Sequence, residues 1–200
     1  TPPFFWWILN RVLFWSAAIS LKTFALNYIE DTPTLSLADL PAVSHTLIFG
    51  GGAGVLLVVL GAGLLADRIG RRPLLVTAGL LAVGGTLLLV VGRDLTWLFA
   101  AGGVLVTSGG VYASASWALA TDLAPPHKGA LYLGLANGAT VIGSISGRLG
   151  GPLIDSVNHL TGQLSLGYLV VFALAGLCFL GSSLVILKIP SSTQRDLAQP

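Results

Sequence analysis

Long stretches without a charged side chain dominate the chain. Residues 4–29 carry Arg11 and Lys22 as their only charged residues, and five later stretches carry none. A transmembrane helix needs roughly 20 mainly apolar residues to cross about 30 Å of hydrocarbon. Each stretch is long enough to supply one such helix. The five uncharged stretches are 40–66, 73–92, 95–121, 129–147 and 156–187.

The pattern inside these stretches favours helices over a β-barrel. Barrel strands alternate polar and apolar side chains, whereas these stretches are rich in Leu, Ala and Gly and show no alternation. We therefore predict an all-α polytopic membrane protein with a six-helix domain over residues 1–190 and a polar tail over 191–200. The helices are expected at about 4–29, 43–66, 73–92, 95–121, 130–152 and 165–188.

Composition excludes the main alternatives to a membrane protein. The 200 residues include 10 Lys and Arg and 8 Asp and Glu, so 9% are charged, against about 25% in soluble domains. A disulfide scaffold is excluded because Cys178 is the single cysteine. The net charge of +2 is too small to indicate a nucleic-acid partner. The partner expected from composition is the lipid bilayer.

The positively charged residues predict how the helices are oriented. Six helices place both ends of the domain on one side, together with the loops after the second and fourth helices. Cytoplasmic loops carry an excess of Lys and Arg. Because only Arg93 lies in the opposite loops, we predict a multi-pass protein of the cell (inner) membrane with both ends, and the tail, in the cytoplasm. The residues on this side are Arg68, Arg71, Arg72, Lys128, Lys188 and Arg195.

The strongest local signal is the short connection between the second and third expected helices, which reads G-L-L-A-D-R-I-G-R-R from Gly63 to Arg72. Asp67 lies at a helix C-terminus, where a carboxylate is unfavourable unless it is paired. Gly70 permits a tight turn with positive φ. Anchoring by positive charges explains Arg68, Arg71 and Arg72, but it does not explain Asp67 or the two glycines.

This pattern, G-x-x-x-D-R-x-G-R-R after the second helix of a six-helix unit, resembles the signature loop of the major facilitator superfamily. Residues 117–126, 134–137 and 150–155 resemble the fourth and fifth helices of the C-terminal half of its permeases. Residues 11–31 look like the first helix of such a half. The resemblance implies helices seven to twelve of a twelve-helix transporter.

A transporter of this family moves its solute by alternating access of two six-helix halves. The resemblance implies a secondary-active or facilitative permease for a small polar solute, with an N-terminal six-helix half as its partner. Because the chain begins Thr-Pro-Pro and contains no methionine, we expect that half to lie upstream in the same chain.

The resemblance also implies a conformational latch on the cytoplasmic side. Asp67 would meet the N-terminus of the fifth helix near residues 129–131, and Arg71 would pair with Asp67. This contact would hold the cytoplasmic face closed in the outward-open state. The latch residues are Gly63, Asp67, Arg68, Gly70, Arg71 and Arg72.

Polar side chains inside the expected helices are candidates for the substrate cavity. Arg11 and Lys22 lie on one face of the first helix, because residues of a helix advance by about 100°. A cation within a membrane normally faces a cavity or a partner. Snorkelling to the headgroups stays open for both, as does pairing of Lys22 with Glu30 or Asp31. The cavity candidates are Arg11, Lys22, Asn27, Tyr112, Trp117 and Asn137.

Two further patterns concern packing. Polar residues within 107–116 predict a polar face on the fourth helix. Glycines repeat every four residues in the fifth helix and predict close contact with a neighbouring helix. The repeats are Gly134 and Gly138, and then Gly143, Gly147 and Gly151.

Two other classes of function stay open. One is a six-helix membrane scaffold or interaction protein without transport activity, and the other is a half-size transporter that acts as a dimer. Catalysis finds no support, because His45, His127 and His159 lie far apart in the sequence and Cys178 is isolated. We therefore predict no enzyme activity, no cofactor and no metal site.

Overall fold

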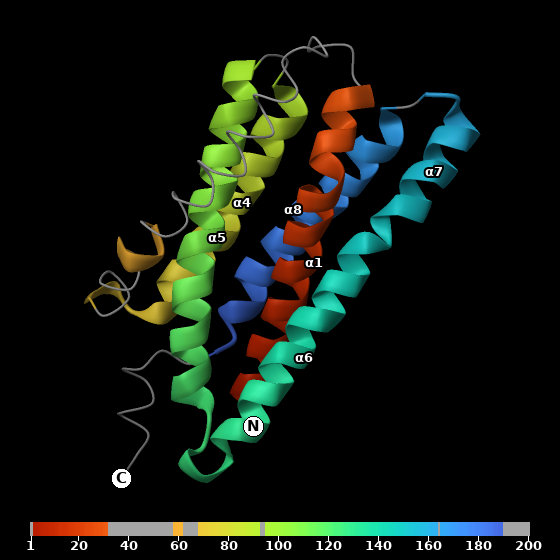
Figure 1. The fold of residues 1–200 in the computed structure, drawn as a ribbon. Coiled ribbons are helices and arrows are strands. Elements are labelled where there is room, and N and C mark those ends of the chain that lie inside the picture. The colour runs from red at the N-terminus through yellow and green to blue at the C-terminus, as the bar shows by residue number, and fades with distance from the viewer. Residues whose placement is uncertain (1, 32–57, 62–67, 93–94, 164, 190–200) are drawn as a thin grey trace.

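The computed structural model is a bundle of long helices (Figure 1). It describes residues 2–31, 58–61, 68–92, 95–163 and 165–189. A short 3-10 turn, η2, occupies Pro126–Lys128. The other elements are α1 (Pro2–Asp31), α4 (Arg71–Val91), α5 (Leu95–Leu123), α6 (Gly129–Arg148), α7 (Gly150–Thr161) and α8 (Leu166–Ile186).

The helical class and most helix positions agree with the sequence pattern. Helices α1, α4, α5 and α8 begin and end close to the predicted bounds. Among the described residues, four segments are long and apolar enough to cross a membrane. The expected helix 43–66 lies outside the described residues except for 58–61, which are helical. The four segments are Pro3–Tyr28, Arg71–Val91, Thr96–Leu123 and Leu166–Ile186.

The expected fifth helix, 130–152, was wrong as a single element. Helix α6 ends at Arg148, Leu149 forms a break, and α7 continues from Gly150 to Thr161. Pro152 explains the break, because a proline inside a helix has no N–H for the carbonyl four residues back. In the first turn of α7 the missing donor does no harm, since N–H groups there have no intrahelical acceptor.

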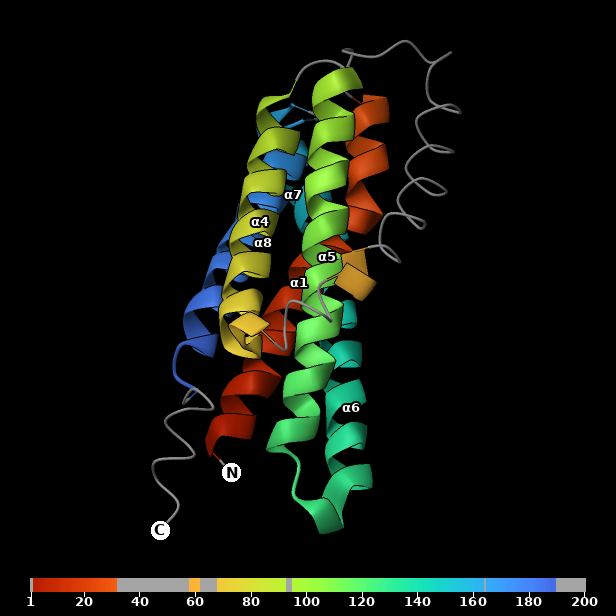
Figure 2. The same ribbon diagram turned by 90° about the vertical axis from the view of Figure 1, so that its left-hand side faces the viewer.

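Helix α1 lies at the centre of the bundle and packs along α6 on one side and α8 on the other. Figure 2 shows α4 alongside both α5 and α8. Helices α5 and α6 are joined through η2 at the end of the bundle that carries Arg71 and Lys128, which we call the basic end. From this end α5 and α6 diverge, and α1 lies between them in Figure 1.

Small residues bring α1 and α6 into close contact. A Cβ atom at Gly143 would lie 2.8 Å from the Val12 carbonyl oxygen, and one at Gly147 would lie 2.5 Å from the Ser16 carbonyl oxygen. The Ser20 hydroxyl donates a hydrogen bond of 3.0 Å to the Gly147 carbonyl. The second predicted glycine repeat is therefore confirmed at Gly143 and Gly147.

The first glycine repeat, Gly134 and Gly138, does not contact another helix among the described residues. A Cβ atom at Gly134 or Gly138 would meet nothing within 4 Å. Both glycines lie on the exposed side of α6, away from α1. The close approach of α1 and α6 therefore depends on the second repeat and not on the first.

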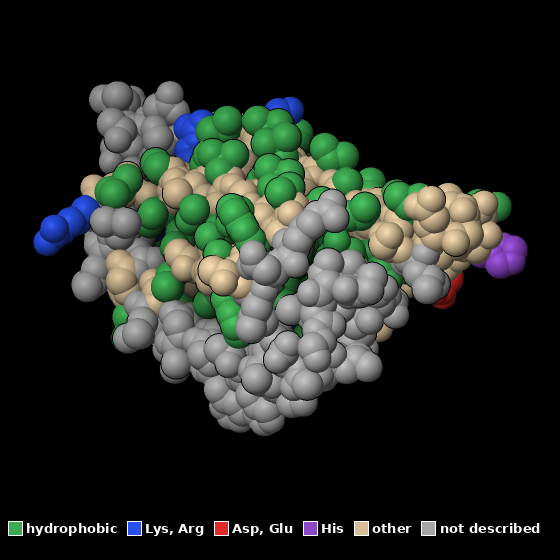
Figure 3. All heavy atoms as spheres, turned by 90° about the horizontal axis from the view of Figure 1, so that it is seen from above, with side chains coloured by type: hydrophobic (Ala, Val, Ile, Leu, Met, Phe, Trp, Pro, Cys, Tyr) green, Lys and Arg blue, Asp and Glu red, His purple; other side chains and the backbone are tan. Residues whose placement is uncertain are grey.

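The outer surface of the described helices is largely apolar. Seen end-on in Figure 3, hydrophobic side chains cover much of the described rim, and charged side chains are few and separate. Exposed apolar patches of this extent mark contact with a membrane or a protein partner. The exposed side chains include Leu80 and Leu87 of α4, Val141 and Ile145 of α6, and Leu177 and Leu184 of α8.

A buried hydrogen-bond network joins α1 to α5 and α8. The Asn10 amide nitrogen donates to the Ser182 hydroxyl at 2.6 Å and to the Ser182 carbonyl at 2.9 Å. The Tyr112 hydroxyl donates to the Asn10 amide oxygen at 2.8 Å. The Tyr112 ring also stacks on Phe14, with ring centroids 3.5 Å apart. This network fixes the register of α1, on which the site described below depends.

We expect Gly147→Leu to lower the free energy of unfolding by about 1–3 kcal/mol, because the new side chain collides with the α1 backbone. Thermal unfolding of the purified chain in detergent measures the loss. Gly138→Leu is the matched control, since that position opens onto free space, and it should leave the melting temperature nearly unchanged. Equal melting temperatures for the two variants would contradict the α1–α6 contact.

We expect Tyr112→Phe to destabilise the bundle by about 1 kcal/mol, because it leaves the Asn10 amide oxygen without its donor. Ser144→Ala is the control, because the Ser144 hydroxyl bonds only the Thr140 carbonyl of its own helix among the described residues. Both variants are compared by thermal unfolding in one detergent. A larger loss in Ser144→Ala than in Tyr112→Phe would rule out the network as a stabilising feature.

Candidate functional site

Arg11 is a buried cation at the junction of three helices. Its side chain is 3% exposed. From α1, its Nε atom donates to the Thr140 hydroxyl at 2.8 Å and to the Ala136 carbonyl at 3.2 Å, both on α6. Its Nη1 atom donates at 3.0 Å to the Ser116 hydroxyl on α5. The guanidinium therefore lies inside the bundle and does not reach out to the headgroups.

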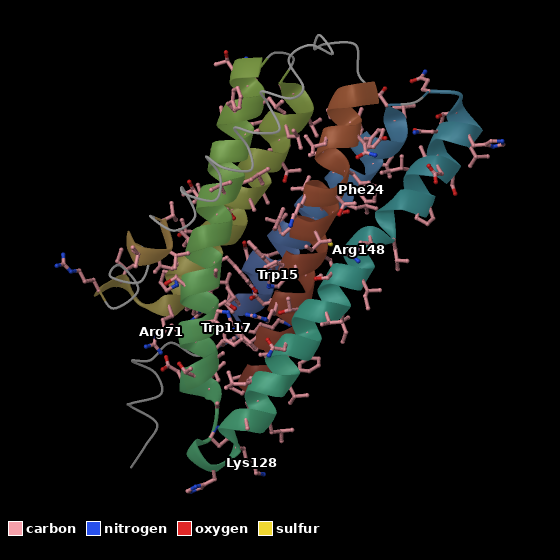
Figure 4. The ribbon with its side chains drawn as sticks, in the orientation of Figure 1. Trp15, Phe24, Arg71, Trp117, Lys128 and Arg148 are labelled. Carbon is pink, nitrogen blue, oxygen red and sulfur yellow. The ribbon has the colours of Figure 1, made fainter. Side chains whose placement is uncertain are left out.

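Two tryptophan rings cover the Arg11 guanidinium. Its Cζ atom lies 5.2 Å from the centroid of the Trp7 ring and 4.4 Å from that of the Trp117 ring. Such cation–π contacts become stronger where water is excluded. Trp7 is fully buried, whereas Trp117 is 39% exposed. Figure 4 shows Trp117 on the side of α5 that faces α1 and α6.

Arg11 lies deep in its apolar segment. The segment begins at Pro3, eight residues before Arg11, so a rise of about 1.5 Å per residue places Arg11 about 12 Å along the helix. Among the described residues, the ion pair of the protein is Arg71–Asp122, and Arg11 has no carboxylate partner. The positive charge of Arg11 is therefore surrounded by neutral acceptors and aromatic rings.

The other predicted cavity residues divide into two groups, of which Tyr112 and Trp117 lie close to Arg11 and the remaining three lie at the surface. Lys22, Asn27 and Asn137 are exposed. Tyr112 is buried, and its hydroxyl is engaged by Asn10. Of the predicted set, the structure brings together Arg11, Tyr112 and Trp117.

The predicted polar face of the fourth expected helix is confirmed on α5. Ser108, Tyr112 and Ser116 follow one another at intervals of four residues, and all three are buried. The Ser108 hydroxyl donates at 2.7 Å to the Ala78 carbonyl of α4. The face therefore connects α5 to both α4 and α1.

The predicted cavity set omitted Trp7, whose ring lies over the guanidinium. It also omitted Thr140 of α6, which accepts a hydrogen bond from Arg11. Thr140 follows Ala136 by one helical turn and precedes Gly143 on the small-residue face of α6 that packs on α1. The signal that identifies Thr140 is a single hydroxyl within a face of small residues. This face lies opposite a helix that carries an embedded arginine.

The expected latch is described in part. Gly63 and Asp67 lie outside the described residues. Arg68 is exposed, and Gly70 has the predicted positive φ, at 93°. Arg72 donates from Nη2 to the Leu187 carbonyl at the end of α8. Within the described part of the signature sequence, the chain turns at Gly70 and leads directly into α4.

Arg71 is the first residue of α4 and has a partner that the sequence did not predict. It forms an ion pair with Asp122 in the last turn of α5, and its Nη1 atom donates to the Ala118 carbonyl at 2.9 Å. The predicted partner, Asp67, lies outside the described residues. The ion pair joins the start of α4 to the end of α5 at the basic end (Figure 4).

A separate pocket of about 200 Å³ lies where α6 breaks into α7. It is bordered by Ser16 and Ser20 of α1, Gly147 and Gly150, and Cys178 of α8. Its lining is mostly apolar, and Arg11 is not part of it. Within the described residues, no group of three His, Cys, Asp or Glu side chains is placed to hold a metal ion.

Comparison with known proteins identifies the family. A search of curated proteins gives no match for the sequence. The family model of the Major Facilitator Superfamily matches residues 3–199, which is nearly the whole chain. The match agrees with the long apolar helices and with the tight turn at Gly70. The chain belongs to the Major Facilitator Superfamily of membrane transporters.

Proposed function

We propose that the chain is the C-terminal six-helix half of a permease that moves a small polar solute by alternating access. Membership of the family and the apolar helices support a multi-pass transporter. The observation that carries the proposal is the Arg71–Asp122 ion pair, because it joins two helices directly beside the signature sequence.

The electrostatics at the end of α5 explain why this ion pair responds to conformation. The C-terminus of a helix carries a partial negative charge, so a carboxylate there is unfavourable unless it is paired. Arg71 neutralises Asp122 and also donates to the Ala118 carbonyl in the last turns of α5. Moving α4 away from the end of α5 leaves both groups without a cation.

The strength of the ion pair suits a contact that opens in every transport cycle. Arg71 and Asp122 are 30% and 40% exposed. Exposed pairs of this kind contribute only about 0–1 kcal/mol, because water screens the charges. The pair therefore biases the basic end towards its closed arrangement without locking it.

The basic end faces the cytoplasm in this proposal. Arg68, Arg71, Arg72 and Lys128 lie at this end, in keeping with the excess of positive residues in cytoplasmic loops. Because α5 leads through η2 into α6, the ion pair also restrains the connection to the helix beside Arg11. We propose that Asp67, which the signature pattern singles out, belongs to the same latch.

Charge reversal tests the latch without knowledge of the solute. The Arg71→Asp and Asp122→Arg variants should each open the basic end, because each places like charges together. The double variant should restore closure, because it rebuilds the pair with its charges exchanged. The reporter is Asn137→Cys in a Cys178→Ser background, labelled in inside-out vesicles with a membrane-impermeant maleimide.

We expect each single reversal to raise the labelling rate several-fold and the double reversal to bring it back towards the starting rate. Lys128→Asp is the matched control, since it makes the same charge change at an exposed position of the same end. Labelling rates that respond equally to Lys128→Asp, or a double reversal that labels faster than either single one, would contradict the latch.

A further inference from the structure

Helix α1 carries a row of buried hydrogen-bond donors. Trp7, Arg11 and Trp15 are spaced four residues apart, so they lie along one face of the helix. The indole nitrogens of Trp7 and Trp15 are buried and have no hydrogen-bond partner among the described residues. An indole N–H donates and cannot accept. The row therefore offers donors and lacks acceptors.

Arg11 also has more hydrogen-bond donors than acceptors around it. A guanidinium carries five N–H groups, and the hydrogen bonds of Arg11 to the described residues involve only Nε and Nη1. Its acceptors are two hydroxyls and one carbonyl, none of them charged. The Nη2 atom thus has capacity for a further acceptor.

The carboxylates of the described helices around Arg11 do not supply a negative charge to balance its guanidinium. Asp122 is the acidic residue of α5 that follows Ser116, and Arg71 engages it at the basic end. Helices α4, α6 and α8 contain no Asp or Glu. A cation inside a membrane protein is normally balanced by a partner, and the described helices around Arg11 provide none.

Trp117 is the residue of the Arg11 cluster that reaches the surface of the described helices. Trp117 covers the guanidinium from α5 and is the partly exposed member of the cluster. A solute that reaches this region meets the Trp117 ring first and the guanidinium behind it.

From these observations we propose that Arg11 binds the anionic group of the transported solute, so that the substrates are small organic anions. This inference rests on the proposed transport function and narrows its substrate class. Nη2 donates to the anion, the indole N–H of Trp7 is the neighbouring unpartnered donor, and Trp117 is the partly exposed ring over the guanidinium. The depth of about 12 Å from the start of the apolar segment favours a soluble anion over a lipid headgroup.

The test compares each anion with a neutral counterpart of similar shape. Isothermal titration calorimetry on the purified chain in detergent uses succinate against succinamide, and glycerol 3-phosphate against glycerol. We expect binding of at least one anion and no binding of its neutral counterpart. Arg11→Gln should weaken that binding about tenfold or more, since it removes charge-assisted hydrogen bonds.

Two further variants separate a binding role from a structural one. Arg11→Lys keeps the charge but has no planar fork, so it should keep the preference for anions with weaker affinity. Arg148→Gln removes a positive charge at an exposed position of α6 and should bind as the unmodified chain does. Circular dichroism verifies that each variant is folded. If Arg11→Gln does not fold, Arg11→Lys decides the question.

Several results would overturn the inference. These are unchanged affinity in both Arg11 variants, equal binding of the neutral counterparts, or no binding of either anion by the unmodified chain. An Arg11-dependent response to phosphatidylglycerol alone would assign the site to a lipid headgroup and would also overturn it. A further result separates the two proposals: the chain binds no anion, while charge reversal at Arg71 and Asp122 changes the labelling rate as expected. That result would support the transport proposal and refute organic anions as its substrate class.

Discussion

The hydrogen bonds of Arg11 are the interaction on which the arrangement of α1, α5 and α6 depends. A guanidinium within an apolar bundle must find acceptors, and here it finds them on two neighbouring helices. Its position is set by the Asn10–Tyr112 network one residue away, which fixes α1 against α5 and α8. Hydrogen bonds therefore fix α1, which carries Arg11, against α5 and α6 on one side and α8 on the other.

Close packing makes this junction possible. The Arg11 side chain reaches α6 because small residues, above all Gly143 and Gly147, let α6 approach the α1 backbone. The same cation joins α5, which ends at the Arg71–Asp122 ion pair. A movement that breaks the ion pair therefore acts on a helix that also contacts Arg11. The proposed latch and the proposed binding residue are connected through α5.

The sequence predicted what local chemistry determines. Charge-free stretches predicted the helical class, and Gly70 predicted a turn with positive φ. The spacing of Gly143 and Gly147 predicted a close contact with a neighbouring helix. The break at Leu149 depends on Pro152, which interrupts a stretch that is otherwise apolar enough to continue as one helix. The hydrogen-bond partners of Arg71 and Arg11 could not be predicted from the sequence, because they lie on helices distant in sequence. The acceptor of the Tyr112 hydroxyl could not be predicted for the same reason, since it lies on α1.

The most direct measurement is an experimental density map of the chain in its membrane, recorded with succinate present. The account predicts carboxylate oxygens of succinate at about 2.7–2.9 Å from Arg11 nitrogens. It also predicts the Trp117 ring beside the bound anion. A map in which a carboxylate of the protein itself pairs with Arg11, and succinate is absent, would contradict it.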